Sequence, residues 1–367
     1  MSFITNIRSV AKYESKILVR SWFFRIFTLL AVVFLGFFNF AMMLMEDNFG
    51  LWFAKSVSSN IPYLNLLLLN TGQAVVAVFL SSEFLKRDKK LDTSEVFYVR
   101  PLSNAEYVIG KIWGNLRVFL LLNLLVLAIV LAFNFMASGI TVDWQAYGVY
   151  FLLISLPTLI FIIGLSIFLM LVLRNQALTF ILLLGYIGLT LFYIQDKFYY
   201  LFDYMVYNLP LFKSTIVGFS SLELILNHRA IYFFAGLGFI FFTIFLFKRL
   251  PNARRSHYPW LFLSLCMFLL AGTAGYRHVR SILREGEIRA LYTSINNKYV
   301  HEPKMAIDWY DISVEQKPET IRSVVGMKGT ALATSEIFTF CLNPGLKVGE
   351  VKEGEKPLDF KREEQIL

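Results

Sequence analysis

The stretch that decides the fold is "YGVYFLLISLPTLIFIIGLSIFLMLVLRNQALTFILLLGYIGLTLFYI", residues 147–194. It holds two apolar runs, Tyr147–Leu173 and Ala177–Ile194, which are separated only by "RNQ". About 20 apolar residues in a helix cross a hydrocarbon core of about 30 Å. We therefore predict two antiparallel membrane spans joined by a tight turn.

The rest of the chain is similarly apolar. Its 367 residues are 57% hydrophobic and 17% charged, with a mean hydropathy of +0.59, whereas soluble domains are roughly 45–50% apolar and about 25% charged. Five more runs are long enough to span a membrane: Phe23–Leu44, Pro62–Glu83, Leu116–Phe135, Ala230–Phe247 and Tyr258–Gly275. The expected fold is an α-helical polytopic membrane protein of about seven transmembrane helices, with a membrane domain over residues 23–275.

Lys and Arg residues are concentrated in alternate connections between these spans. Residues 1–25, 86–117, 174 and 248–255 hold seventeen of them, and the intervening connections hold only Lys55, Lys197, Lys213 and Arg229. Because basic residues favour the cytoplasmic side, we predict a cytoplasmic N-terminus and an extracytoplasmic tail from Arg277 onward. This topology explains the net charge of +9. Nucleic-acid binding would require a basic patch on a soluble face, which this distribution of charge does not show.

Residues 1–22 are predicted to form an amphipathic helix in the membrane interface. Its apolar residues recur at helical spacing opposite its basic residues: Phe3, Ile7, Val10, Ile17, Leu18 and Trp22 against Arg8, Lys12, Lys16 and Arg20. The run that follows is long enough to span and has no cleavage site, so we expect it to be retained. A basic anchor and a functional role explain the helix equally well.

The tail after the last span divides into a linker, residues 276–304, and a small β-rich region, residues 305–367. Strand patterns are expected in "MAIDWYDISVEQ" (305–316), "VVGMKGTALAT" (324–334), "IFTFCLNPGLKV" (337–348) and "KPLDF" (356–360), with turns at "KPET" (317–320) and at Asn343-Pro344-Gly345. These strands are too few for an independent β domain. We therefore expect a partial domain and sequence missing after Leu367.

Cysteine and histidine usage indicates no disulfide and no metal site. Cys266 lies in a span and Cys341 in the tail. The four histidines, at positions 228, 257, 278 and 301, have no second ligand at metal-binding spacing.

One charged connection, "LKRDKKLDTSEVFYVRPLSNAEYVIGK" at residues 85–111, holds two helix-start signals. Asp92 with Glu95, and Ser103 with Glu106, have the spacing of a capping box. The first helix must end before Pro101, which limits it to about two turns. The second is expected to continue into the third span.

The short helix after Asp92 exposes Val96 and Phe97, and two turns are marginal alone in water. It therefore packs either on its own spans or on a cytosolic partner. The order of residues in this connection resembles type-2 ABC exporter permeases, over residues 1–250. The matching elements are Arg87-Asp88, Asp92-Thr93, Glu95, Pro101-Leu102-Ser103 and Gly110-Lys111. The family's glycine before Thr93 is Asp92 here, and its leading glutamate is displaced to Glu83.

This resemblance implies a six-span exporter permease with one extra span, in a bacterial cytoplasmic (inner) membrane, working as a homo- or heterodimer. It implies that the loop over residues 84–115 carries a coupling helix bound by a separate ABC ATPase that holds ATP and Mg²⁺. The implied coupling residues are Lys86, Arg87, Asp88, Asp92, Thr93, Glu95, Val96, Phe97, Pro101 and Ser103. We expect no cofactor and no enzymatic activity in this chain, because "GMKGT" at 326–330 lacks the spacing and ending of a phosphate-binding loop.

The family's second and fifth spans line a transport cavity. That likeness implies substrate contacts for Asn70, Gln73, Tyr186 and Tyr193. Polar groups inside spans more often hold helices together, and this alternative stays open.

The tail resembles the opening strands of the β domain in aminopeptidase N-like zinc metallopeptidases, through its strand rhythm and the phrase "FCLNPGLKV". That family needs an H-E-x-x-H zinc motif, and "HEPKM" at 301–305 has Met305 in place of the second histidine. The alternative function is therefore a truncated membrane anchor of such a peptidase. A scaffold that transports nothing is a third possibility.

Overall fold

The computed structural model describes residues 3–44, 57–82, 102–136, 142–214, 218–219, 221–247, 258–316 and 320–367. It divides into two compact units, Met1–Arg280 and Ser281–Leu367. Within the described ranges, seven helices are long and apolar enough to cross a membrane. This confirms a helical polytopic membrane fold.

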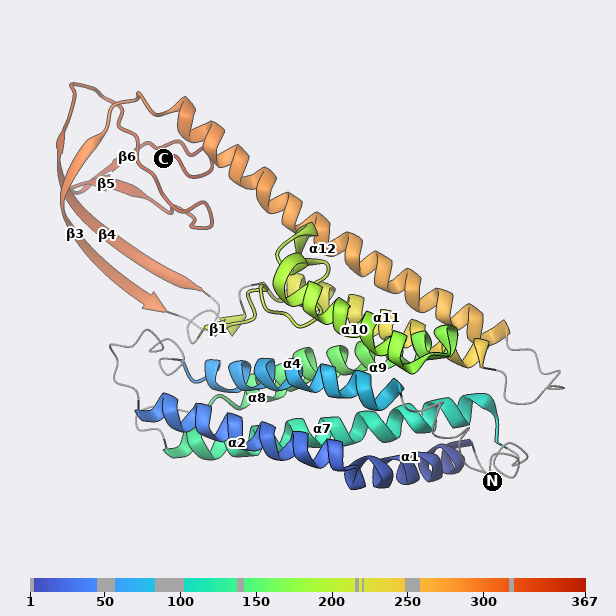
Figure 1. Cartoon of the computed structure of the whole chain (residues 1–367). Helices are drawn as coiled ribbons and strands as arrows, with labels where there is room; N and C mark the ends of the chain where they lie inside the picture. The colour runs from blue at the N-terminus through green and yellow to red at the C-terminus, as the bar shows by residue number, and fades with distance from the viewer. Residues whose placement is uncertain are drawn as a thin grey trace. The chain divides into compact units, whose positions relative to one another are not determined.

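The first unit is a bundle of long helices (Figure 1). In chain order these are α1 (Phe3–Arg20), α2 (Trp22–Leu44), α4 (Asn60–Ser82), α7 (Asn104–Met136), α8 (Trp144–Tyr150), the π-helix η1 (Phe151–Ser155), α9 (Leu156–Leu173), α10 (Gln176–Leu189), the π-helix η2 (Thr190–Ile194), α11 (Leu222–Leu246) and the start of α12 (Tyr258–Lys298). Between η2 and α11 lie a 3₁₀ turn, η3 (Phe198–Tyr200), and two short paired strands, β1 (Lys213–Ser214) and β2 (Gly218–Phe219).

The tight turn predicted between the fourth and fifth spans is present. Arg174 ends α9 in the left-handed conformation, with φ 53°. Asn175 then caps α10 by accepting a hydrogen bond from the backbone N–H of Leu178 at 3.2 Å. Two residues thus reverse the chain, because one supplies the positive φ and the next supplies the cap.

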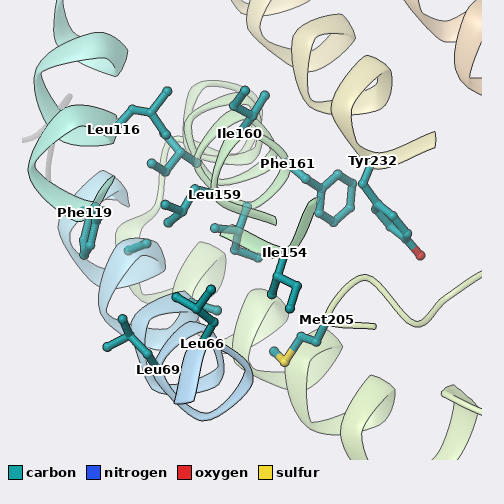
Figure 2. Close-up of a cluster of buried hydrophobic side chains, with 14 of the residues drawn as sticks. Leu66, Leu69, Leu116, Phe119, Ile154, Leu159, Ile160, Phe161, Met205 and Tyr232 are labelled. Atoms are coloured by element: carbon teal, nitrogen blue, oxygen red, sulfur yellow. The ribbon is translucent and has the colours of Figure 1, made fainter. Parts of the chain in front are cut away.

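The core lies where α4, α7, α9 and α11 meet. Figure 2 shows side chains from these helices and from the connection before α11 packed into one cluster. Glycines allow α9 and α11 to approach closely: a Cβ on Gly236 would lie 2.7 Å from the backbone nitrogen of Phe161, and one on Gly164 would lie 2.6 Å from the carbonyl oxygen of Gly236. Only glycine fits at such a crossing.

One predicted boundary is wrong. The sixth helix begins at Leu222 and not at Ala230, so Arg229 lies inside a helix and not in a connection. The seventh helix continues from Tyr258 to Lys298, so most of the segment predicted as a linker, residues 276–304, is helical.

The helix predicted over residues 1–22 is present as α1, and its buried face packs along the first turns of α7. Ser15 donates a hydrogen bond to the carbonyl of Gly114 at 2.7 Å, and Glu14 forms an ion pair with Lys111 at 3.0 Å. Phe3 and Trp22, from the predicted apolar face, are exposed in the isolated chain. Its place in the membrane interface stays a prediction.

The second unit contains two antiparallel hairpins. β3 (Met305–Gln316) pairs with β4 (Ile321–Ala331), and β5 (Val351–Glu353) pairs with β6 (Lys356–Leu358). The turn at Asn343 is confirmed, since its side-chain oxygen accepts from the N–H of Gly345 at 2.9 Å. The strand predicted over residues 337–348 is wrong: Cys341 forms only an isolated bridge to Ile366.

Candidate functional site

Four buried polar side chains from three helical segments, α4, α7 and η1, form a hydrogen-bond network inside the bundle. Asn70 of α4 donates to Asn123 Oδ1 of α7 and to Ser155 Oγ of η1, each at 3.1 Å. Asn123 donates to Gln73 Oε1 at 2.9 Å, and the Ser155 hydroxyl donates to Asn123 Oδ1 at 2.8 Å. The network therefore fixes α4, α7 and η1 relative to one another.

Local sequence explains why the network is complete. Asn70 and Gln73 are three residues apart, so they share one face of α4. Asn70 also donates to the carbonyl of Leu66 at 2.8 Å, and Asn123 to that of Phe119 at 2.7 Å. An unpaired amide in this apolar setting would be costly. The second amide hydrogen of Asn123 is satisfied by the Phe119 carbonyl, while the two amide hydrogens of Asn70 are shared among three acceptors, Leu66 O, Asn123 Oδ1 and Ser155 Oγ.

The structure brings together two of the four predicted substrate residues, Asn70 and Gln73. Tyr186 is half-buried and stacks on Tyr204, with ring centroids 5.5 Å apart. Tyr193 is exposed, and Lys197 Nζ lies 3.2 Å from the centre of its ring. Their role in binding substrate stays a prediction.

Next to the network, α11 contributes a fully buried arginine, Arg229. Its guanidinium donates to the carbonyl of Leu153 at 2.6 Å, to the carbonyl of Tyr204 at 2.9 Å and to Thr158 Oγ1 at 2.8 Å. A charged side chain inside a span is rare and marks a functional or organising position. Here it joins α11 to η1, α9 and the connection before α11.

Pro157 explains why the helix that runs from η1 into α9 needs a hydrogen-bond donor from another element. Proline has no backbone N–H, so the carbonyl of Leu153, four residues earlier, lacks its normal helical partner. Arg229 Nε supplies the missing hydrogen bond. The π-helix η1, which ends just before Leu156, changes the backbone bonding at the same place.

The connection between η2 and α11 reaches deep into the bundle. Tyr204, Met205, Val206, Leu209 and Leu211 are each at most 3% exposed. Thr71 lies eleven residues into α4, which is about 16 Å along the helix, and its hydroxyl meets the Tyr207 hydroxyl at 2.5 Å. Irregular backbone at such depth is tolerated only where protein groups satisfy it, and the Tyr204 carbonyl accepts from both Arg229 and Thr158.

Asp203 stabilises the turn in this buried connection. Its carboxylate accepts from the N–H groups of Tyr207 at 3.0 Å and Asn208 at 2.8 Å. Burial raises the pKa of Asp203, although these hydrogen bonds and the charge of Arg229 oppose the shift. The connection is thus a packed part of the bundle and not a surface loop.

Sequence reasoning missed Arg229 because the start of its helix was placed too late. A signal was present, because Ser220 and Glu223 have capping-box spacing just before the run that contains Arg229. Starting the helix there would have placed a charge inside a span.

At the start of α7, the second predicted capping box is present. Ser103 N–H donates to Glu106 Oε2 at 2.6 Å, and Glu106 N–H donates to Ser103 Oγ at 3.2 Å. Asn6 of α1 donates to the other oxygen of Glu106 at 2.9 Å, and Asn104 donates to the carbonyl of Phe247 at 2.6 Å. The start of α7 is therefore held by α1 and by the end of α11.

The remaining predicted coupling residues lie outside the described residues. They are Lys86, Arg87, Asp88, Asp92, Thr93, Glu95, Val96, Phe97 and Pro101. Of the predicted set, only Ser103 can be placed, in the capping box that begins α7.

A comparison of the chain with protein-family models, with curated proteins and with solved structures returns no match.

Proposed function

We propose that the chain is the membrane-spanning permease subunit of an ATP-driven exporter. Substrate would move by alternating access, and a separate ABC ATPase would drive the change by binding the short helix after Asp92. The observation that carries the proposal is the ordered residue pattern over 85–111, which includes the capped start of the membrane helix α7 at Ser103. The resemblance to type-2 exporter permeases gives that pattern its meaning.

The contacts at the start of α7 support this role mechanically. A displacement of residues 92–101 would reach α7 through Ser103, which lies two residues after Pro101. Glu106 is bonded to α1, and Lys111 is paired with Glu14 of α1 with both side chains at most 4% exposed. Because α1, α7 and the end of α11 are joined here, a displacement of the loop would move several helices together.

ATP hydrolysis in the complex tests the proposal. The full chain would be co-expressed with an ABC ATPase that is encoded in the same operon or found in the same membrane. The complex would then be purified in detergent. Phe97→Asp puts a charge on the predicted docking face, so we expect at least a tenfold loss of co-purified ATPase and of its stimulation. The matched control is Ile337→Asp, which changes an apolar residue that is 77% exposed in the second unit.

Equal association and equal ATP hydrolysis in Phe97→Asp and Ile337→Asp would refute the coupling role. A complex that forms without any transport ATPase among its members would favour the anchor or scaffold alternative.

A further inference from the structure

Two buried histidines join α11, α12 and the turn that follows η2. His228 of α11 and His278 of α12 are both fully buried, and their ring centroids are 5.0 Å apart. His228 Nε2 lies 3.0 Å from the carbonyl oxygen of Tyr200, and His278 Nε2 lies 2.8 Å from that of Tyr199. A carbonyl only accepts hydrogen bonds, so Nε2 is the donor in both rings. We call these two rings and two carbonyls the histidine contact.

The other nitrogen of each ring opposes protonation. Among the described residues, neither Nδ1 atom has a hydrogen-bond partner. A proton added there would create a buried N–H donor without an acceptor and would place a positive charge in an apolar setting, both of which are costly. The histidine contact is therefore built for neutral rings.

Arginines adjoin the pair on both helices. Arg229 follows His228 on α11 and is itself fully buried, so a charge on the histidines would lie close to a second buried cation. Arg277 precedes His278 on α12 and is exposed. Neither arginine can offset the charge of an imidazolium.

Two other titratable groups lie near the pair. The ring of Tyr232, on α11, is 5.2 Å from that of His228. Asp203, in the connection, interacts electrostatically with Arg229. Burial raises the pKa of Asp203, so acid favours its buried form. Asp203 would therefore strengthen the closed structure in acid, which is the opposite of the effect expected from the histidines.

The turn that supplies the carbonyls is conformationally unusual. Phe198, Tyr199 and Tyr200 have φ values of 51°, 59° and 62°. Non-glycine residues rarely adopt positive φ, and such strain persists where the surroundings determine the conformation. The two histidine bonds supply part of those surroundings. Their loss would allow the turn to relax.

α12 is also attached to α11 nearer its own start. Ser264 Oγ donates to the carbonyl of Gly238 at 2.8 Å, and the ring of Phe268 lies 5.1 Å from that of Phe239. None of these groups titrates between pH 5 and pH 8. The first turns of α12 can therefore stay packed when the histidine contact opens.

We propose that the histidine contact is a pH-sensitive switch, which holds the turn over residues 198–200 on α11 and α12 at neutral pH and opens in acid. In the open form both rings reach water and take up protons. An imidazole in water is half protonated at a pH of about 6.5. If the rings bind protons only when open, the equilibrium constant for opening rises about a hundredfold from pH 7.5 to pH 5.5. This proposal does not depend on the transport function.

Hydrogen exchange in the full chain, purified in detergent, measures this opening. The N–H of Leu201 donates to the carbonyl of Phe198, and that of Asp203 donates to the carbonyl of Tyr200, each at 3.1 Å. These N–H groups exchange when the turn opens. After correction for the intrinsic exchange rate at each pH, we expect their protection to fall about a hundredfold from pH 7.5 to pH 5.5.

The informative variants are His228→Gln and His278→Gln, because a glutamine amide can still donate to a carbonyl and does not titrate. We expect the loss of protection to shrink to about tenfold in each single variant and to less than about twofold in the double variant. The readout is the change with pH, so a variant that is less stable at every pH remains informative. His301→Gln, at an exposed position in the second unit, is the matched control and should behave as wild type.

Asp203→Asn is the second control and should retain the loss of protection in acid. Wild type with equal protection at both pH values would overturn the proposal, as would a double glutamine variant that loses as much protection as His301→Gln. Exchange in α9 that becomes as fast at pH 5.5 as exchange in the turn would show unfolding of the whole bundle, and would also overturn it.

Discussion

At the residue scale, the decisive side chain is Arg229, a buried cation whose hydrogen-bond acceptors are neutral oxygens. Three of its bonds go to backbone carbonyls, those of Leu153, Ile154 and Tyr204, and one goes to Thr158. It replaces the helical hydrogen bond that Pro157 removes. The same side chain donates to the Tyr204 carbonyl in the buried connection before α11, so it links two irregular segments through their backbone carbonyls.

Replacing Arg229 by methionine should destabilise the protein, because carbonyls that remain buried lose their donor. Each such group costs about 1–3 kcal/mol, and we expect a loss of at least that size as a lower unfolding temperature in detergent. Arg229→Lys keeps the charge but not the forked geometry and should fall between methionine and wild type.

The matched control for this prediction is Arg284→Met, an exposed arginine in the second unit, which should change stability by less than about 0.5 kcal/mol. If Arg229→Met unfolds at the same temperature as Arg284→Met, the bonds of Arg229 do not stabilise the bundle.

At the element scale, the spans could be predicted from the sequence and their irregular parts could not. Long apolar runs and the "RNQ" turn are local signals, as are the capping boxes, and the Ser103–Glu106 box is present as expected. The burial of the connection after η2 depends on contacts with α4 and α11, which no local pattern encodes.

The helical periodicity of residues 1–22 described α1 and its packing on α7 only in part. Helical periodicity correctly predicted the helix. It did not reveal that Glu14, the one acidic residue of α1, pairs with buried Lys111.

Breaking this ion pair should be strongly destabilising. Glu14→Gln removes the carboxylate that pairs with the buried Lys111 ammonium, and removing one partner of a buried ion pair costs about 3–5 kcal/mol in comparable sites. The double variant Glu14→Gln with Lys111→Met should recover part of the loss, as measured by thermal unfolding. Lys16→Gln, an exposed neighbour on α1, serves as the control, and a Glu14→Gln variant as stable as this control would contradict the role of the pair.

At the scale of the whole membrane unit, polar ties join distant connections at one end of the bundle. Lys213 Nζ pairs with Asp143 at 2.6 Å, its carbonyl accepts from Ser59 at 2.8 Å, and its N–H donates to the Tyr150 hydroxyl at 3.1 Å. These contacts connect the starts of α4 and α8 with the segment before α11.

The Asp143–Lys213 pair predicts a pH dependence of stability. Burial alone would raise the pKa of Asp143, but hydrogen bonds from Lys213 Nζ and the Ala146 N–H outweigh it and hold the pKa below its usual value. A depressed folded pKa stabilises the protein above the unfolded value of about 3.9, and this stabilisation is lost as pH falls through the folded pKa. Thermal unfolding between pH 7 and pH 3 should therefore fall more steeply in wild type than in Asp143→Asn; identical curves would exclude this contribution.

We propose that residues 92–100 dock on an ATPase. A photo-crosslinking amino acid at position 97 of the full chain, expressed in its native membrane, tests it most directly. We predict that light links this position to a chain with a Walker A motif, and that the same probe at position 337 does not. Crosslinks from position 97 only to lipid or to this chain's own helices would contradict the claim.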